Sequence, residues 1–206
     1  MRSLPNTGTL RKAGQRNEDP GADQWNDRST HNFYNSYASI TARNLDAEVT
    51  GAVNSGMGVS IGWNEYEAWQ VWDRQEANPD AEIYPPEIQA PDVFIINLGE
   101  NDNSFTYANG LDFPEDYADR YIELVKEIRG RYPDTLIVCA LGGMHGGKFS
   151  RVLNSAWQKA FDQLSAEDPM VKQFKFEMYS NSHPRVDAHE AMAVELTEFL
   201  KTEMGW

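Results

Sequence analysis

The stretch from Asp92 to Asp102 constrains this 206-residue chain more than any other. It contains four consecutive β-prone apolar residues, Val93 to Ile96, which is typical of a strand buried on both faces, and Gly99 ends the run. Gly-Glu-Asn-Asp follows at once. In open α/β sheets, ligands bind at the carboxyl ends of the strands, so polar side chains in this segment are well placed for binding or catalysis. Asn101 could donate an N–H to a developing oxyanion, whereas the alternative is a turn whose polar side chains satisfy only local backbone groups.

Strands and helices alternate on both sides of this stretch. We expect strands over residues 48–53, 93–96, 135–141 and 174–178, and helices over 36–45, 65–76, 113–130, 149–166 and from 186 onward. This alternation predicts one domain over residues 1–206, with an α/β fold, a three-layer α/β/α sandwich around a parallel sheet.

Two segments do not fit the alternation. Residues 104–112 have no clear pattern and are expected to form a loop. Residues 1–35 are polar and are expected to be irregular, so the first strand of such a fold is missing or atypical. A gap in the sheet would be prone to pairing, which leaves open a homodimer or a strand supplied by a partner chain.

Charge and composition exclude several classes of function. The formal net charge of −14 is spread along the chain and argues against nucleic acid or an anionic membrane as partner. The single cysteine, Cys139, lies in an apolar strand and is expected to be a small buried hydrophobe. The four histidines show no ligand spacing, so neither a metal nor an organic cofactor is expected.

The hydropathy of the chain gives an expectation for the cellular location of the protein. The chain has no apolar run of membrane length and no secretory apolar region after Met1. As written it is expected to be cytoplasmic, or secreted or periplasmic if an export segment was lost.

Three segments at strand ends or helix starts carry complementary chemistry. They are Asn54-Ser55-Gly56, the Gly-Glu-Asn-Asp segment containing Asn101, and Ser182-His183-Pro184. The backbone N–H of Gly56 and the side-chain N–H of Asn101 would form an oxyanion hole, with His183 as general base. A nucleophile is not yet among them. His145 and His189 are expected to be structural.

In this order and spacing, the three segments resemble the Gly, Asn and His blocks of the SGNH (GDSL-like) hydrolase superfamily. Within it, the chain looks most like carbohydrate esterase family two. The likeness spans about residues 30 to 200 and rests on Ser36-Tyr37 with Thr41-Ala42-Arg43, Asn54 to Gly58, Ile96 to Asp102, His183-Pro184, His189 and Met192-Ala193. The resemblance implies a serine esterase that removes acetyl groups from plant-polysaccharide sugars, so the expected substrate is an acetylated saccharide or a small acyl ester.

The chain departs from the family pattern at the position of the acid. The resemblance implies an acidic residue three positions before the histidine, but Ser180 stands there. A Ser-His dyad, with a backbone carbonyl orienting the imidazole, would serve instead because the ring's second N–H needs only an acceptor.

The second departure is the missing Gly-Asp-Ser nucleophile motif. Family spacing puts it at Gly8-Thr9-Leu10, which keeps the glycine and loses the serine. Ser3 is the other candidate nucleophile, but it has no room for a preceding strand. A third explanation is a coding region whose true beginning, serine included, has been lost or replaced.

Aromatic residues suggest a rival function. Trp63, Trp69 and Trp72 are expected to pack in the core or loops, or to offer stacking surfaces to a sugar. With the missing serine, they leave open a non-catalytic protein that binds carbohydrate or a protein partner on the same fold. A flavodoxin-like domain that binds a phosphate group is disfavoured by the acidic charge and by the absence of a suitable glycine-rich loop.

Overall fold

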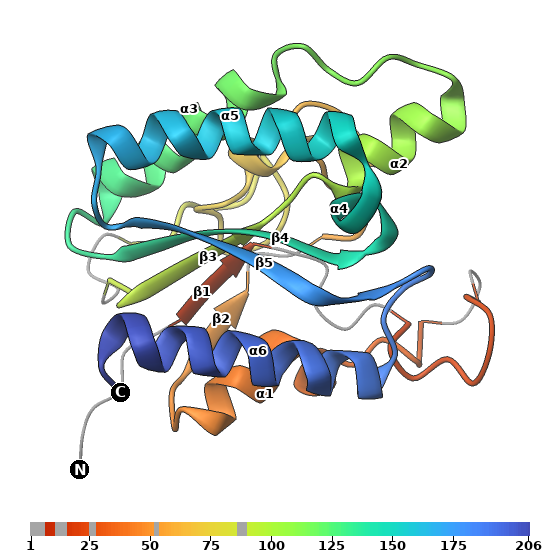
Figure 1. Cartoon of the computed structure of the whole chain (residues 1–206), viewed down its shortest axis with the longest axis horizontal. Helices are drawn as coiled ribbons and strands as arrows, with labels where there is room; N and C mark the ends of the chain where they lie inside the picture. The colour runs from red at the N-terminus through yellow and green to blue at the C-terminus, as the bar shows by residue number, and fades with distance from the viewer. Residues whose placement is uncertain (1–6, 11–15, 25–27, 52–53, 86–89) are drawn as a thin grey trace.

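The computed structural model describes residues 7–10, 16–24, 28–51, 54–85 and 90–206 (Figure 1). Within this part of the chain, five parallel strands form one sheet in the order β2-β1-β3-β4-β5. The strands are β1 (Thr7–Leu10), β2 (Val49–Gly51), β3 (Val93–Asn97), β4 (Leu136–Met144) and β5 (Val171–Ser180). The helices are α1 (Tyr37–Asn44), α2 (Glu100–Asn109), α3 (Tyr117–Arg131), α4 (His145–Phe149), α5 (Arg151–Glu167) and α6 (Val186–Met204), with 3₁₀ turns η1 (Phe33–Asn35) and η2 (Ala68–Gln70).

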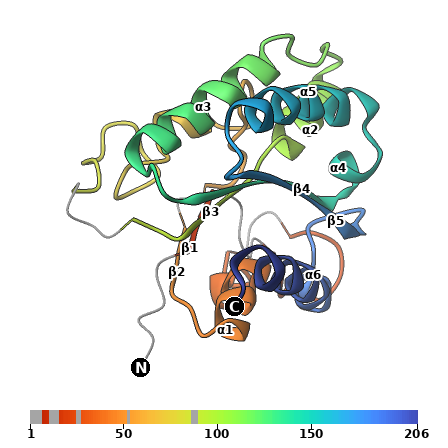
Figure 2. The same cartoon turned by 60° about the vertical axis from the view of Figure 1, so that its left-hand side comes forward.

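Helices cover both faces of the sheet, which confirms the predicted α/β/α sandwich. Figures 1 and 2 show α3 and α5 on one face and α1 and α6 on the other. The buried strand β3 serves both layers because its side chains alternate. Val93 and Ile95 pack in the cluster that includes Tyr37 of α1 and Met192 of α6, while Phe94 and Ile96 pack on the other face. None of the described helices is both long and apolar enough to span a bilayer.

Of the two alternatives for the first strand, missing or atypical, the structure contradicts the first and agrees with the second. Thr7–Leu10 forms β1 in the interior of the sheet, between β2 and β3, where Thr7 is paired with Val49 on one side and Val93 on the other. The pattern concealed it because the strand is four residues long and contains two threonines and a glycine. Its place comes from backbone pairing on both sides, which side-chain periodicity does not report. The same chain therefore fills the gap that suggested pairing with a second copy.

Two other expectations are also corrected. The helix expected over 65–76 is reduced to η2, which is tied to the preceding loop by the hydrogen bond from the Ala68 N–H to the Gly58 carbonyl. The loop expected over 104–112 is mostly helical, because α2 runs to Asn109. Its polar sequence has no apolar stripe. Features typical of helix ends are nevertheless present. Acidic residues lie in the first turn of α2, and Gly110 follows its last turn in the left-handed conformation.

The strand order decides where a ligand can bind. The chain passes from β1 to β2 on one side and then returns to β3 on the other, so the order reverses between β1 and β3. In open α/β sheets, the loops at the carboxyl ends of such neighbouring strands part and leave a crevice. The segments after β2 and β3, which carry Gly56 and Asn101, open at this crevice.

Candidate active site

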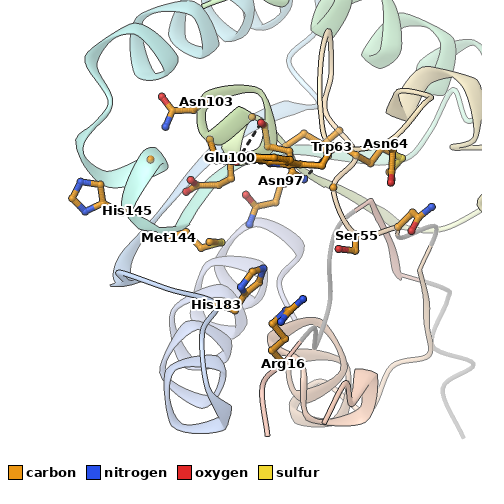
Figure 3. A pocket seen from close by; sticks show the side chains of 18 of the residues that line it. Arg16, Ser55, Trp63, Asn64, Asn97, Glu100, Asn103, Met144, His145 and His183 are labelled. Atoms are coloured by element: carbon orange, nitrogen blue, oxygen red, sulfur yellow. Dashed lines mark hydrogen bonds between the residues drawn. The ribbon is translucent and has the colours of Figure 1, made fainter. Parts of the chain in front are cut away.

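A cleft of about 1360 Å³ opens at this edge of the sheet (Figure 3). Gly56, Asn101 and His183 all belong to its lining. They come from three separate places: the loop after β2, the first turn of α2 and the loop before α6. The structure therefore brings together the three residues that the sequence analysis assigned to one site, and their individual roles stay predictions.

The first turn of α2 organises one side of the cleft. The Asn101 Nδ2 atom donates to the Met57 carbonyl at 2.7 Å, which holds the amide beside the Gly56 turn. A side-chain amide has two N–H groups, so this bond uses one of them. This hydrogen bond thus fixes the Asn101 side chain relative to the segment that contains Gly56, the other expected oxyanion donor.

Asp102, the next residue, anchors the loop after β2. Its fully buried carboxylate accepts hydrogen bonds from the backbone N–H groups of Val59, Ser60 and Ile61, at 3.0, 2.8 and 3.2 Å. Burial raises the pKa of Asp102 to about 6, against the opposing effect of these backbone hydrogen bonds. The carboxylate thereby fixes the short segment that leads to Trp63.

Glu100 holds a third segment and explains the glycine cluster after β4. Its Oε1 accepts from the Gly147 N–H at 2.7 Å. A Cβ added to Gly146 would lie 2.4 Å from Glu100 Oε2, and one added to Gly147 would lie 2.7 Å from Oε1. The two glycines are thus required by close packing on Glu100. The alternative of a turn whose side chains satisfy only local backbone groups is therefore wrong for Glu100 and Asp102, because the backbone groups that they bind belong to other segments.

Gly56 is a position where only glycine fits. Its φ is +93°, and an added Cβ would lie 2.9 Å from the Trp63 Cβ. Trp63 also donates its backbone N–H to the Gly56 carbonyl at 2.7 Å. Its ring is half-exposed at the cleft, where Nε1 donates to Ser104 Oγ at 3.0 Å. Trp63 is therefore placed to contact a ligand in the cleft.

The other two tryptophans proposed for sugar stacking lie elsewhere. Trp72 is a core residue whose Nε1 donates to Glu127 at 3.1 Å. Trp69 and Trp72 line a separate hollow with Gln70, Asp73, Arg74, Pro79 and Glu127. The structure therefore does not bring Trp69 and Trp72 to the cleft of His183.

His183 is nearly buried, and its partner is not the backbone carbonyl expected from the sequence. Its Nδ1 lies 2.6 Å from Oδ2 of Asp23, a residue of the N-terminal segment. Burial raises the pKa of Asp23, but the hydrogen bonds and charges of His183 and Arg185 outweigh this effect and hold the pKa below its usual value. Sequence reasoning missed Asp23 because it stands in a polar stretch without periodicity, 160 residues before the histidine.

The other two histidines of interest differ: the buried position of His189 agrees with the structural role expected for it, whereas for His145 that role stays a prediction. His189 is buried in α6, where its Nδ1 accepts the Tyr37 N–H at 3.2 Å at the start of α1. His145 is exposed at the cleft, with Nδ1 3.3 Å from Oδ1 of Asn181. Among the described residues, no group of three or more His, Cys, Asp or Glu side chains is arranged to hold a metal ion. Cys139 is fully buried as expected, and burial raises the pKa of its thiol to about 12.

The candidate nucleophile Ser3 lies outside the described residues. The family-spacing candidate, Gly8-Thr9-Leu10, forms β1 itself. A nucleophile on a strand-to-helix turn would follow Leu10, yet residues 11–15 read Arg-Lys-Ala-Gly-Gln and contain no hydroxyl or thiol. Three serines line the described part of the cleft, namely Ser55, Ser104 and Ser150. Ser104 bonds Trp63 and the Asn101 carbonyl, and Ser150 caps α5, whereas Ser55 is exposed beside Gly56.

The sheet order and the placement of Gly56, Asn101 and His183 define the class, a three-layer α/β protein with the SGNH hydrolase fold. No family model matches the chain. It is 29% identical over 200 residues to the cellulase/esterase CelE of Acetivibrio thermocellus, covering 92% of this chain and 24% of that protein. It is 27% identical over 201 residues to an acetylxylan esterase / glucomannan deacetylase of Cellvibrio japonicus, covering 92% and 52%.

A solved structure agrees with these relatives. A family two carbohydrate esterase from Clostridium thermocellum, in complex with cellohexaose, is 26% identical with a TM-score of 0.85, covering 100% of this chain and 66% of that chain. The chain thus spans about a quarter and about half of the lengths of the two curated relatives. The resemblance to family two carbohydrate esterases is confirmed.

Proposed function

We propose that this chain is a serine ester hydrolase that removes acetyl or other short acyl groups from carbohydrates. The observation that carries the proposal is the convergence of Gly56, Asn101 and His183 on one cleft at the switch point of the sheet. The names of the relatives, an acetylxylan esterase / glucomannan deacetylase and a carbohydrate esterase bound to cellohexaose, support an acetylated saccharide as substrate.

The chemistry follows from the positions of these groups. The imidazole of His183 accepts the proton of a serine hydroxyl as the oxygen attacks the ester carbonyl. The N–H of Gly56 and the side-chain N–H of Asn101 stabilise the negative charge on the carbonyl oxygen. The imidazolium of His183 then donates its proton to the departing sugar oxygen as the bond between that oxygen and the acyl carbon breaks, and water, activated by the same imidazole, releases the acid from the acyl-enzyme. In each step, the chain's own groups supply the proton transfers and the binding of the oxyanion.

Hydrolysis of p-nitrophenyl acetate tests the proposal. We expect His183→Ala to lower kcat by about 10²- to 10⁴-fold, the usual contribution of a general base. The matched control is His145→Ala, which removes an exposed histidine of the same cleft and should leave kcat within about threefold. A wild-type chain no faster than His183→Ala would contradict an esterase function.

A fluorophosphonate probe tests the serine mechanism directly, because it labels an activated serine and leaves a mass that peptide mapping locates. Ser3 is a candidate nucleophile from the sequence, and if it is the nucleophile, Ser3→Ala should abolish both labelling and turnover. Ser55→Ala is the comparison, since Ser55 is exposed in the described cleft. Label on Ser55 would reassign the nucleophile, and a chain that takes no label at all would argue against an acyl-enzyme.

One observation favours a second function, the binding of carbohydrate without turnover. The strand that should lead into the nucleophile ends at Leu10, and no serine follows it before residue 16. Trp63 still offers an exposed ring in the cleft. Xylo- or manno-oligosaccharide binding without acetate release, lost in Trp63→Ala and kept in Trp69→Ala, would support this function over hydrolysis.

A further inference from the structure

The N-terminal segment 16–24 is built into the site through His183 and Arg185. Asp23 Oδ2 lies 2.6 Å from His183 Nδ1, and the side chains of Asp23 and His183 are only 15% and 9% exposed. The residue three positions before the histidine is Ser180, which is not acidic, and the side chain of the next residue, Asn181, contacts His145. The carboxylate on the imidazole therefore comes from the other end of the chain.

Arg185 holds this carboxylate in place. Its Nη2 lies 3.0 Å from Asp23 Oδ1, so the two carboxylate oxygens have different partners. Its Nη1 donates to the carbonyls of Arg16 and His183, at 3.1 and 2.8 Å, and its Nη2 also donates to the Gly21 carbonyl. One guanidinium thus ties both the backbone of the segment and its carboxylate to the loop that carries the histidine.

Backbone contacts support the same attachment. The Val186 N–H at the start of α6 donates to the Asn17 carbonyl at 3.1 Å, and the Asn32 N–H donates to Asn17 Oδ1 at 3.0 Å. Arg16, Asn17 and Asp19 are buried. The segment is therefore packed at the site although it contains no helix or strand, and the position of Asp23 depends on several contacts besides its own.

We propose that Asp23 is the positioning residue of His183, taking the role that an acid just before the histidine would otherwise fill. This inference rests on the proposed function and deepens it. An ionised carboxylate only accepts hydrogen bonds, so the Nδ1 atom of His183 carries a hydrogen that it donates to Asp23. The basic nitrogen is then Nε2, at the opposite edge of the ring.

The carboxylate also acts during the reaction. When the serine hydroxyl passes its proton to Nε2, the imidazole becomes a cation with N–H groups on both nitrogens. Asp23, 2.6 Å away, stabilises this cation by charge and hydrogen bond, and it keeps its own negative charge throughout. Removing the charge should therefore weaken the histidine as a base while leaving substrate binding intact.

The test compares Asp23→Asn with the wild type. We expect kcat for p-nitrophenyl acetate to fall about 10²-fold with KM within about threefold. The acidic limb of the kcat/KM profile should move to lower pH, since an uncharged neighbour no longer favours the imidazolium. Asp23→Glu, which keeps the charge, should restore the position of this limb.

Other charged groups near the imidazole are unchanged in these variants. Besides Arg185, the cleft lining contributes Arg16, Arg28, His31, Glu100 and His145. The matched control is Asp19→Asn, in the same segment. Asp19 is buried and accepts the Gln24 N–H at 2.8 Å, so its loss disturbs the packing without removing the carboxylate at His183. It should leave the acidic limb in place.

An NMR titration separates this inference from the proposed function. The midpoint of the His183 imidazole signal should fall to lower pH in Asp23→Asn and stay unchanged in Asp19→Asn. A shifted midpoint in a chain without esterase activity would support the pairing and overturn the proposed hydrolysis. An active chain whose midpoint and acidic limb are the same in wild type and Asp23→Asn would overturn the role of Asp23.

Discussion

The two sides of the cleft are held in place by different forces. On the oxyanion side, Glu100 and Asp102 bind backbone N–H groups of other segments, and Asn101 lies between them. On the base side, His183 is held by the charged groups of Asp23 and Arg185. The first side is continuous with the core of the domain, whereas the second depends on a segment without regular structure.

Because of this difference, we expect substitutions on the two sides of the cleft to have different effects on stability and on activity. A substitution in the first turn of α2 disturbs buried backbone bonds and should reduce the free energy of unfolding. A substitution in the Asp23 pair acts directly on the imidazole proposed as the base and should appear first in activity and in its pH dependence. The following three predictions test this contrast, beginning with the largest expected effect.

Gly99→Ala should be the most destabilising change on the oxyanion side. Gly99 has a φ of +120°, and an added Cβ would lie 2.5 Å from Leu153 Cδ1 and 2.6 Å from the Tyr117 hydroxyl oxygen. Backbone strain and overpacking together should lower the free energy of unfolding by about 3–5 kcal/mol, measured by urea denaturation. The matched control is Gly110→Ala, with a φ of +63° and nothing within 4 Å of the added Cβ, which should lose only about 1 kcal/mol. Equal losses would mean that Leu153 and Tyr117 move aside freely.

Asn101→Ala should separate activity from stability within the same helix turn. Loss of an oxyanion donor is expected to lower kcat by about 10²- to 10³-fold. The folded state loses only the bond to Met57, so the free energy of unfolding should fall by about 1 kcal/mol. Asn109→Ala, which removes an exposed amide bonded to the Phe105 carbonyl in the same helix, should change neither quantity appreciably. A kcat for Asn101→Ala within threefold of wild type would remove Asn101 from the mechanism.

Stability should depend on pH in opposite directions at Asp102 and Asp23. The pKa of Asp102 is raised to about 6, so the folded state binds its proton more tightly than the unfolded state. The contribution of Asp102 to the free energy of unfolding is fully present below its ordinary pKa near 4 and is lost as pH rises to about 6. The loss is on the order of 3 kcal/mol. The pKa of Asp23 is lowered, so its contribution is present above the ordinary value and is lost as pH falls below it.

Urea denaturation from pH 3 to 7 measures both effects. The difference in unfolding free energy between wild type and Asp102→Asn should change between pH 4 and 6 in favour of the variant and then stay constant. For Asp23→Asn, the difference should shrink below pH 4, and it should also fall as pH rises through the titration of His183, whose midpoint the variant moves to lower pH. Parallel profiles for the two variants would show that the two sides of the cleft are not held by different electrostatics.

Elements with a clear side-chain period could be predicted, and elements without one could not. The buried run in β3 and the apolar stripes of α3 and α5 identified their segments to within a few residues. β1 was missed because its four residues show no alternation, and α2 was missed because its own polar sequence has no apolar stripe. Helix η2 was overpredicted because aromatic residues at helical spacing pack equally well in a loop.

Some residues of the site could likewise be predicted from the sequence, and others could not. Gly56, Asn101 and His183 could be found because each stands in a short segment beside a recognisable strand or helix. Asp23 could not, because no local pattern marks a carboxylate whose partner is 160 residues away. Trp63 differs from Trp69 only through the fold, which turns one ring to the cleft and leaves the other beside a separate hollow.

By itself, the sequence determined the layered α/β architecture, the identity of three cleft residues and the resemblance to carbohydrate esterases. These are encoded locally, since apolar periodicity and short motifs depend on neighbouring residues. The tertiary structure alone decided the pairing of β1, the anchoring of three segments by the first turn of α2 and the carboxylate beside His183. Such contacts join residues far apart in the chain, and their energies arise only when folding buries the groups together.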